Sequence, residues 1–201
     1  MSIAYDAGVS PAPARTSTDA IVAAARRILE ADGLSAVTMR SVGEAVGVRG
    51  PSLYKRVPDR AALLRAVGDA VVADLAAMLS RSTSSDDPGA DLRRVATAYR
   101  AFVRANPNGY QLLFSALPAG ASPDPDALAS LGEPIVRAMA RLAGEPVALE
   151  GARTMVAWAH GFVSMERAGG FRLGGDLDSA YAFGIEAILA GISAAARPGS
   201  R

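Results

Sequence analysis

The stretch from Thr38 to Arg60, TMRSVGEAVGVRGPSLYKRVPDR, places the tightest constraint on what this chain can fold into. It begins with a threonine, which caps helices well, and Val42 and Val46 then lie on one side of a helix of about two turns. Gly47 can take the left-handed conformation that ends such a helix. Pro51 suits the first turn of the next helix, where its missing N–H is not needed. The stretch therefore predicts two short helices joined by a tight turn.

Helical periodicity continues on both sides of this pair. Before it, apolar residues recur at helical spacing from Thr18 to a stop at Gly33, and after it a long helix is expected at about 59–81. The polar segment 82–91 contains a proline and a glycine and shows no periodicity, so we place a domain boundary there. Beyond it, further helices are expected at about 90–105, 107–117, 124–143, 146–169 and 177–196.

The expected fold class is all-α, because no stretch alternates convincingly between apolar and polar residues as strands do. About nine helices are expected. They would form a three-helix helix-turn-helix domain at 18–63, preceded by a flexible arm at 1–17, and a helical C-terminal domain at 82–201. The helix at 59–81 would connect the two.

Composition excludes several classes of protein. Half of the 201 residues are hydrophobic, which is enough for a buried core. The chain has no cysteine and a single histidine, so disulfides, thiolate metal sites, histidine clusters and a catalytic triad cannot be built. No phosphate-binding loop and no nucleophile with a base partner is recognisable. We therefore expect no enzyme activity, no metal and no cofactor.

The N-terminal residues do not resemble a secretory signal, since they contain an acidic residue and two prolines and no basic residue before Arg15. An uninterrupted apolar run of the roughly 18 residues that span a bilayer is not found either. A cytoplasmic protein without a membrane partner is expected.

Positive charge is concentrated in the helix pair. The whole chain has a net charge of only +1, so any affinity for nucleic acid must come from a local patch. Arg49, Lys55, Arg56 and Arg60 face one acidic residue, Asp59, which gives this segment a local balance of +3. In the three-helix form of the helix-turn-helix motif, the second helix of the pair enters the DNA major groove and residues around it hold phosphates.

This segment resembles the DNA-binding domain of the TetR family of transcriptional regulators, over about residues 18–67. Residue type and spacing agree together at Ala24, Ala25, Ile28, Leu29, Gly33, Thr38, Arg40, Ala45, Gly47, Val48, Leu53, Tyr54 and Leu63. Two positions depart from the commonest pattern: Pro51 stands where glycine is frequent, and Arg56–Val57 replace a frequent His–Phe pair. Both are expected to change the detail of docking and to leave DNA binding in place.

The resemblance implies DNA-binding residues on and around the second helix. We expect groove contacts from Arg49, Ser52 and Lys55, a close approach of the helix start at Gly50 and Pro51, and phosphate contacts from Thr38, Tyr54 and Arg56, with Arg40 as a further candidate. For each of them the alternative is a solvated basic face that reads no sequence. Arg15 in the arm either reaches a minor groove or is simply solvated.

The second half resembles a TetR-family C-terminal domain marked by a Trp-x-His-Gly sequence, here Trp158-Ala159-His160-Gly161. The family encloses an effector cavity in this domain, so the large residues become pocket candidates: Tyr99, Phe102, Tyr110, Phe114, Met139, Met155, Trp158, His160 and Phe162. Aromatic and methionine stripes at helical spacing are more often plain core, which remains the alternative. His160 is either a packed polar group or a ligand-binding or pH-sensitive one.

The last expected helix is apolar nearly all round, which indicates either deep burial or a partner chain. A terminal helix is a poor candidate for the centre of a core, so we expect a homodimer. The apolar stripe expected at the dimer interface is Tyr181, Ile185, Ile188, Leu189 and Ile192. Family members dimerise through their last two helices as a four-helix bundle, in agreement with this interpretation.

The sequence thus predicts a homodimeric, DNA-binding transcriptional regulator. It is expected to be a repressor that releases a palindromic operator on double-stranded DNA when a small, largely apolar molecule binds the C-terminal domain. The alternative is a helical small-molecule-binding protein with a non-functional DNA head.

Overall fold

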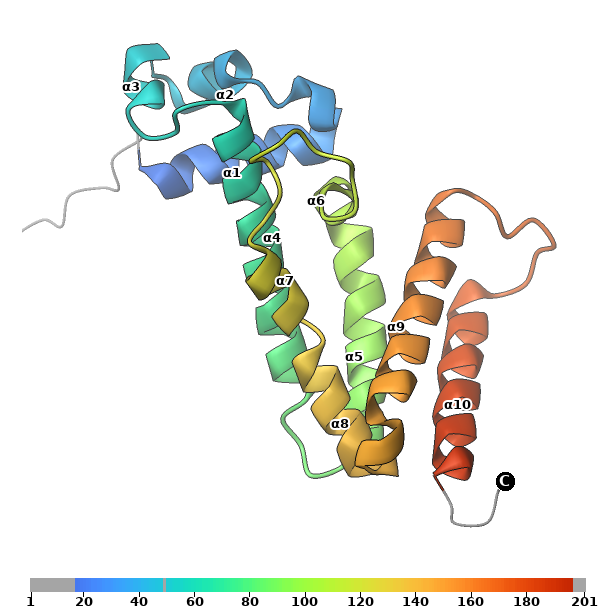
Figure 1. Cartoon of the computed structure of the whole chain (residues 1–201). Coiled ribbons are helices and arrows are strands. Elements are labelled where there is room, and N and C mark those ends of the chain that lie inside the picture. Colours follow the sequence, from blue (N-terminus) through green and yellow to red (C-terminus); the bar gives the residue numbers. More distant parts are fainter. Residues whose placement is uncertain (1–16, 49, 197–201) are drawn as a thin grey trace, which may run out of the picture.

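The computed structural model describes residues 17–48 and 50–196, and every regular element in these ranges is helical (Figure 1). This confirms the predicted all-α fold class. The described ranges contain ten α-helices and one 3-10 helix, η1, against about nine helices expected. The expected arm up to residue 16, with Arg15, and the groove candidate Arg49 lie outside the described residues.

The N-terminal part contains the predicted pair of short helices. Its elements are α1 (Thr18–Asp32), η1 (Leu34–Ala36), α2 (Met39–Val46) and α3 (Gly50–Tyr54). Gly47 takes the left-handed conformation, with φ 70° and ψ 32°, and the N–H of Val48 donates to the carbonyl of Gly43 at 3.0 Å. Pro51 lies in the first turn of α3, as predicted.

The remaining helices form a long C-terminal part (Figure 1). They are α4 (Arg60–Ser82), α5 (Pro88–Ala105), α6 (Pro107–Leu112), α7 (Pro125–Ser130), α8 (Glu133–Ala143), α9 (Glu145–Arg167) and α10 (Leu177–Ala195). Two of them differ from expectation. The helix expected at 107–117 ends at Leu112, and the one expected at 124–143 is divided into α7 and α8. A continuous helix would need the N–H that Pro134 lacks, so the chain restarts at Glu133 with this proline in the first turn.

The helix α4 belongs to both hydrophobic cores. Its first half buries Leu63, Leu64 and Val67 against residues of α1, α2 and α3. From Val71 onward its buried residues join a second core made with α5, α8, α9 and α10. The two cores therefore meet within one continuous helix, which mechanically links the ends of the molecule.

A buried ionic network ties α5 to the last two helices. Arg100 is only 6% exposed; it donates to both carboxylate oxygens of Glu166 on α9, at 2.7 and 3.0 Å, and lies 2.8 Å from the carboxylate of Asp178 on α10. Its guanidinium also lies 4.9 Å from the ring centre of Tyr181. Hydrogen bonds from Arg100, with help from Arg104, hold the pKa of Glu166 below its usual value although partial burial acts to raise it. The network fixes how α9 and α10 sit on α5.

Candidate nucleic-acid interface and ligand pocket

The inner face of the helix pair fixes the position of α3. Leu53 is 1% exposed and belongs to the first core. Gly43 on α2 allows close packing, because a Cβ there would lie 3.4 Å from the carbonyl oxygen of Val48 and 3.6 Å from the side chain of Leu53. With its inner face held in this way, α3 turns its opposite face to solvent.

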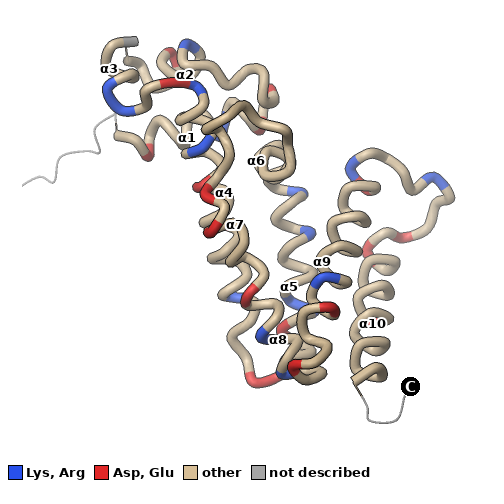
Figure 2. The backbone as a smooth tube through the Cα atoms, in the orientation of Figure 1, with Lys and Arg blue, Asp and Glu red and all other residues tan. Residues whose placement is uncertain are grey.

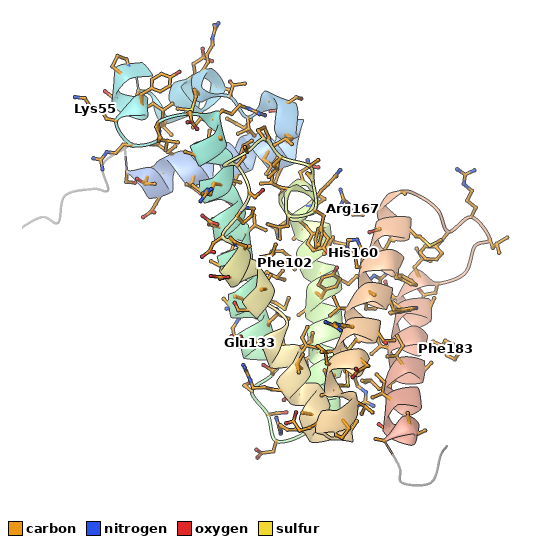
Figure 3. The ribbon with its side chains drawn as sticks, in the orientation of Figure 1. Lys55, Phe102, Glu133, His160, Arg167 and Phe183 are labelled. Carbon is orange, nitrogen blue, oxygen red and sulfur yellow. The ribbon has the colours of Figure 1, made fainter. Side chains whose placement is uncertain are left out.

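That outer face carries most of the predicted DNA-binding residues. Pro51, Ser52, Tyr54, Lys55 and Arg56 are all exposed, and Figure 2 marks basic positions of the backbone next to α3. Lys55 lies at the tip of this end (Figure 3). The fold thus brings these residues together on one accessible surface, which we call the α3 face. A DNA major groove is wide enough to admit one α-helix.

The other two candidates lie on α2. Arg40 is exposed and pairs with Glu44 at 2.9 Å. Thr38 was expected to offer its hydroxyl and the free backbone N–H groups of the helix start to phosphate, and this contact stays a prediction. The hydroxyl accepts from the N–H of Ser41 at 3.0 Å and donates to the Ser41 hydroxyl oxygen at 2.9 Å, while the N–H of Thr38 donates back to that oxygen. Thr38 is therefore used inside a capping box that begins α2.

Arg60 has a different role from the one that the charge count of the helix pair gave it. It was counted with the basic residues of the pair, yet it is half-buried and faces the interior of the head. Its Nε donates to the carbonyl of Val37 at 2.7 Å and a terminal nitrogen donates to the carbonyl of Leu34 at 2.8 Å. This arginine holds η1 against the start of α4, and the exposed charge of the pair is correspondingly smaller.

A cavity of about 250 Å³ lies in the C-terminal part, between α4, α5, α8 and α9. Among the pocket candidates, Tyr99, Tyr110, Phe114 and Met155 line it. The sequence interpretation missed the aliphatic part of the wall, which includes Leu75, Leu79, Leu128, Leu131, Ile135 and Val156. The helical spacing of Leu75 and Leu79 was visible in the sequence, but it predicts only a buried face and says nothing about an empty volume behind it.

Two more open hollows adjoin this cavity on the side of α9. One is about 500 Å³ and the other about 410 Å³, and both are lined by Tyr110, Phe114 and His160. The predicted candidate His160 therefore lines both open hollows, close to α6 (Figure 3), and Tyr110 and Phe114 line all three spaces. The ring centre of Phe114 lies 5.0 Å from those of Tyr110 and His160.

Three polar side chains beside these spaces form a hydrogen-bonded chain. The hydroxyls of Tyr99 and Tyr110 contact each other, and the Tyr110 hydroxyl lies 2.7 Å from Nδ1 of His160. Burial, reinforced by the hydrogen bond to Tyr110, raises the pKa of Tyr99 far above its usual value. Burial also raises the pKa of Tyr110, although the hydrogen bond from Tyr99 and the charge of Arg167 act against the rise. Both phenols therefore stay protonated at neutral pH.

Four other pocket candidates do not line these spaces. Met139 is fully buried in the second core, and Phe102 packs against the edge of that core. Trp158 and Phe162 stack on Tyr181 of α10, with ring centres 5.3 and 5.0 Å from the Tyr181 ring. Trp158 and Phe162 are four positions apart and therefore share the side of α9 that meets α10.

Three residues of the predicted dimer stripe on α10 are buried in their own chain: Tyr181, Ile185 and Leu189 are each 4% exposed and belong to the second core. Ile188 and Ile192 are only partly buried against that core, so their place at a dimer interface stays a prediction. The exposed side of α10 is a different apolar one, carrying Phe183, Ala187, Ala190 and Ala194. Phe183 is 76% exposed and points away from the rest of the chain (Figure 3). By length and composition alone, α10 is also long and apolar enough to cross a membrane, and 17% of its apolar 18-residue stretch is buried inside the chain.

The helix α6 lies between the cavity and the helix pair. Its Tyr110 lines the cavity, while the carboxylate of Glu30 at the end of α1 accepts from the N–H groups of Asn108 and Gly109 at 3.0 and 2.7 Å. The side-chain amide of Asn108 donates to the carbonyls of Leu29 and Glu30 at 3.0 and 3.1 Å. Glu30 and α6 thus form a direct contact between the two ends of the molecule, which we call the α1–α6 clamp.

Comparison with protein families gives two matches. Residues 21–67 match the family described as bacterial regulatory proteins, tetR family, and residues 92–188 match a family described as tetracyclin repressor-like, C-terminal domain. An uncharacterised HTH-type transcriptional regulator of Mycobacterium tuberculosis is 30% identical over 163 residues, which cover 78% of this chain and 73% of the relative.

Solved structures share the fold. A protein of unknown function from Rhodococcus sp. RHA1 superposes with a TM-score of 0.76 at 22% identity, over 91% of this chain and 97% of that one. A TetR variant from Acinetobacter baumannii AYE in complex with minocycline gives a TM-score of 0.66 at 22% identity, over 90% and 98% of the two chains. Apo ActR from Streptomyces coelicolor gives 0.67 at 19% identity, over 92% and 98%.

Proposed function

Because the chain belongs to the TetR family and is therefore a helix-turn-helix transcriptional regulator, we propose that it acts as a homodimeric repressor that a small molecule releases from DNA. In this proposal the α3 face of each protomer enters a major groove of a palindromic operator. The head at 18–63 reads DNA, α4 connects, and the domain at 82–201 binds the effector and the partner protomer. The effector is largely apolar, and the protein acts in the cytoplasm without a cofactor.

The observation that carries this proposal is the position of the cavity relative to the two connecting elements. Leu75 and Leu79 of the cavity wall lie on the same helix that buries Leu63 and Leu64 in the head. Tyr110 of the wall lies on α6, one residue from Gly109 in the α1–α6 clamp. A molecule that enlarges the cavity must displace some of the helices that line it, because close-packed interiors do not absorb added volume without movement, and in this proposal α4 and α6 pass the displacement on to the head.

Coupling of this kind is reciprocal. If the effector lowers affinity for the operator by some factor, the operator lowers affinity for the effector by the same factor. Equal effector affinity of the free and the operator-bound dimer would therefore contradict the proposal. The analogy for effector binding comes from the TetR variant in complex with minocycline, whose 22% identity to this chain supports a shared fold only.

Support for the dimer comes from the exposed apolar side of α10. Phe183 and the alanines of that side form an apolar strip next to α9, whose own exposed residues include Ala157 and Met165. Exposed apolar strips of this kind mark association surfaces in soluble proteins. Pairing by a two-fold axis would place two α3 faces on one side of the dimer, to meet half-sites about 34–36 Å apart or at a related spacing.

Lys55 gives an unusually clean test, since it is the only lysine in the chain. Purified protein is titrated onto DNA fragments from around its own coding region at two salt concentrations, and the Lys55→Ala variant is measured in parallel. Since Lys55 is expected to contact bases in the groove, we expect selective binding by the wild type, and weaker, less selective binding by the variant. Lysine-directed acetylation should weaken binding to a similar degree, and bound operator should protect Lys55 from the reagent.

The matched control is Arg137→Ala, which removes an exposed basic residue of α8 far from the α3 face. It should leave both affinity and selectivity unchanged. Binding that is unchanged both by Lys55→Ala and by acetylation of Lys55 would exclude this face as the reading surface. Failure of every fragment to bind better than random DNA would favour the alternative of a small-molecule-binding protein with an idle head.

A further inference from the structure

The chemical character of the effector can be read from the three adjoining spaces, on the premise that the proposed effector site is correct. The inner cavity is apolar: aliphatic side chains dominate its wall, and the hydroxyls of Tyr99 and Tyr110 are occupied with each other and with His160. The open hollow beside it, of about 410 Å³, is more polar than the inner cavity, because Gln111, His160, Ser164 and Arg167 line it together with aromatic and apolar residues. Tyr110 and Phe114 belong to both walls, so the two spaces lie side by side.

The direction of the hydrogen-bonded chain decides what His160 presents to the hollow. If Tyr99 donates to Tyr110 and Tyr110 donates to Nδ1 of His160, every hydroxyl proton has an acceptor. The reverse direction would leave the proton of the largely buried Tyr99 hydroxyl without an acceptor among the described residues, which is costly. With Nδ1 accepting, the imidazole carries its proton on Nε2. This nitrogen has no hydrogen-bond partner within the described residues, and His160 lines both open hollows, so it can offer an N–H donor to a ligand bound there.

Arg167 adds a positive charge to the same hollow. Its guanidinium contacts only the side-chain oxygen of Gln111, at 3.3 Å, and forms no ion pair with the acidic residues of the described ranges. The neighbouring Glu166 is fully used by Arg100 and Arg104 on the other side of α9. In Figure 3 Arg167 and His160 lie on the same stretch of α9, one above the other. No carboxylate of the described ranges lines this hollow.

We propose that the effector is an amphipathic anion, with an apolar chain in the inner cavity and a carboxylate bound by Nε2 of His160 and the guanidinium of Arg167. A carboxylate matches the site because it supplies only acceptors, whereas His160 and Arg167 supply only donors. A neutral or cationic molecule with the same apolar chain leaves the arginine unpaired or repels it. The site therefore selects the charge of the ligand's head group through residues of α9, and it selects the ligand's apolar chain through residues of α4, α5 and α8.

The test compares three probes that share a chain and differ in the head: decanoate, decanol and decyltrimethylammonium. Binding to the full-length protein is measured by calorimetry at concentrations below micelle formation. We expect decanoate to bind about tenfold to a hundredfold more tightly than decanol, which is the range for charge-assisted hydrogen bonds. The ammonium compound should bind most weakly. The Arg167→Gln variant should lose the preference for decanoate over decanol and keep its affinity for decanol.

Two further variants keep the inference falsifiable. Arg172→Gln changes an exposed arginine in the loop after α9 and should behave as the wild type. Arg153→Gln changes the arginine of the larger hollow, of about 500 Å³. If Arg153→Gln abolishes the preference and Arg167→Gln does not, the proposed position of the head is wrong. Equal binding of decanoate and decanol, or no binding of any probe, overturns the inference about ligand class.

Operator binding, measured with the same protein, separates this inference from the proposed function. If decanoate binds as expected but does not weaken binding to the operator, the ligand class stands and the release mechanism fails. If operator binding is intact and insensitive to all three probes, and none of them binds, the inference fails and the regulator remains a DNA-binding protein.

Discussion

Arg56 and Arg60 lie four residues apart, and their side chains serve different purposes. Arg56 is exposed beside Lys55 on the α3 face, whereas Arg60 is half-buried and donates hydrogen bonds to two backbone carbonyls of the head. Sequence composition treats both as equal units of positive charge. The hydrogen-bond partners show that one is available to a phosphate and the other maintains the surface on which the first is displayed.

This difference gives the first prediction at the residue scale. Arg60→Ala leaves the carbonyls of Leu34 and Val37 without their donor, so we expect the free energy of unfolding to fall by about 1–3 kcal/mol. Arg56→Ala removes an exposed side chain and should change it by less than about 0.5 kcal/mol. Urea denaturation of the two variants measures both values. Operator binding by the folded proteins should be weakened more by Arg56→Ala than by Arg60→Ala. Equal losses of stability in the two variants would contradict the structural role given to Arg60.

At the scale of elements, α6 is short but makes more than one long-range contact. The N–H groups of Asn108 and Gly109 are held by Glu30 of α1, and Tyr110, the next residue, lines the cavity. Gly109 permits this approach, since a Cβ at that position would lie 2.9 Å from a carboxylate oxygen of Glu30 and 3.2 Å from Val71. A negative charge at a helix N-terminus is also favoured by the helix dipole. The clamp therefore transmits displacement of α6 to α1.

The second prediction concerns this clamp. Glu30→Ala removes the acceptor of two backbone N–H groups, so hydrogen exchange of the Asn108 and Gly109 amides should accelerate, and the free energy of unfolding should fall by about 1–3 kcal/mol. Hydrogen–deuterium exchange followed by mass spectrometry measures the first effect. Glu44→Ala, which removes only the exposed partner of Arg40, serves as the control and should leave α6 unchanged. Unaltered exchange in peptides that contain Asn108 would show that α6 is held by other contacts.

At the scale of the whole molecule, the apolar surface left on α10 is the feature that a monomer does not explain. The inward side of this helix packs into the second core through Tyr181, Ile185 and Leu189. The outward side still presents Phe183 and a row of alanines to solvent. Small side chains permit close approach of a second helix, and Phe183 projects far enough to fill a hollow on it. The proposed dimer buries this surface twice, once from each protomer.

The third prediction tests that surface. Phe183→Glu introduces two like charges into a symmetric interface, and the dimer dissociation constant should rise at least about tenfold from lost burial alone. Analytical ultracentrifugation measures the change, and operator binding should weaken in parallel because one protomer meets only one half-site. Ala77→Glu, on an exposed position of α4, is the matched control. Dimers that survive Phe183→Glu would place the interface elsewhere.

The sequence by itself determined the local features. The cap at Thr38, the left-handed Gly47 and the first-turn Pro51 follow from backbone conformations that only certain residue types favour. Periodicity likewise determined the all-α class and most helix bounds. The exceptions are the helix expected at 107–117, which ends at Leu112, and the helix expected at 124–143, which Pro134 divides. Tyr99 and Tyr110 were identified as pocket candidates through family resemblance and size, and both line the cavity.

The tertiary structure alone decided what each buried side chain faces. Periodicity shows that Tyr181, Ile185 and Leu189 share a side of α10, but it does not distinguish their own core from a partner chain. It gives no sign that Arg60 binds carbonyls more than twenty positions earlier in the chain, or that Glu30 meets α6 nearly eighty positions later. These contacts, and the cavity itself, depend on the packing of helices distant in sequence, and a local pattern holds no record of which neighbours that packing supplies.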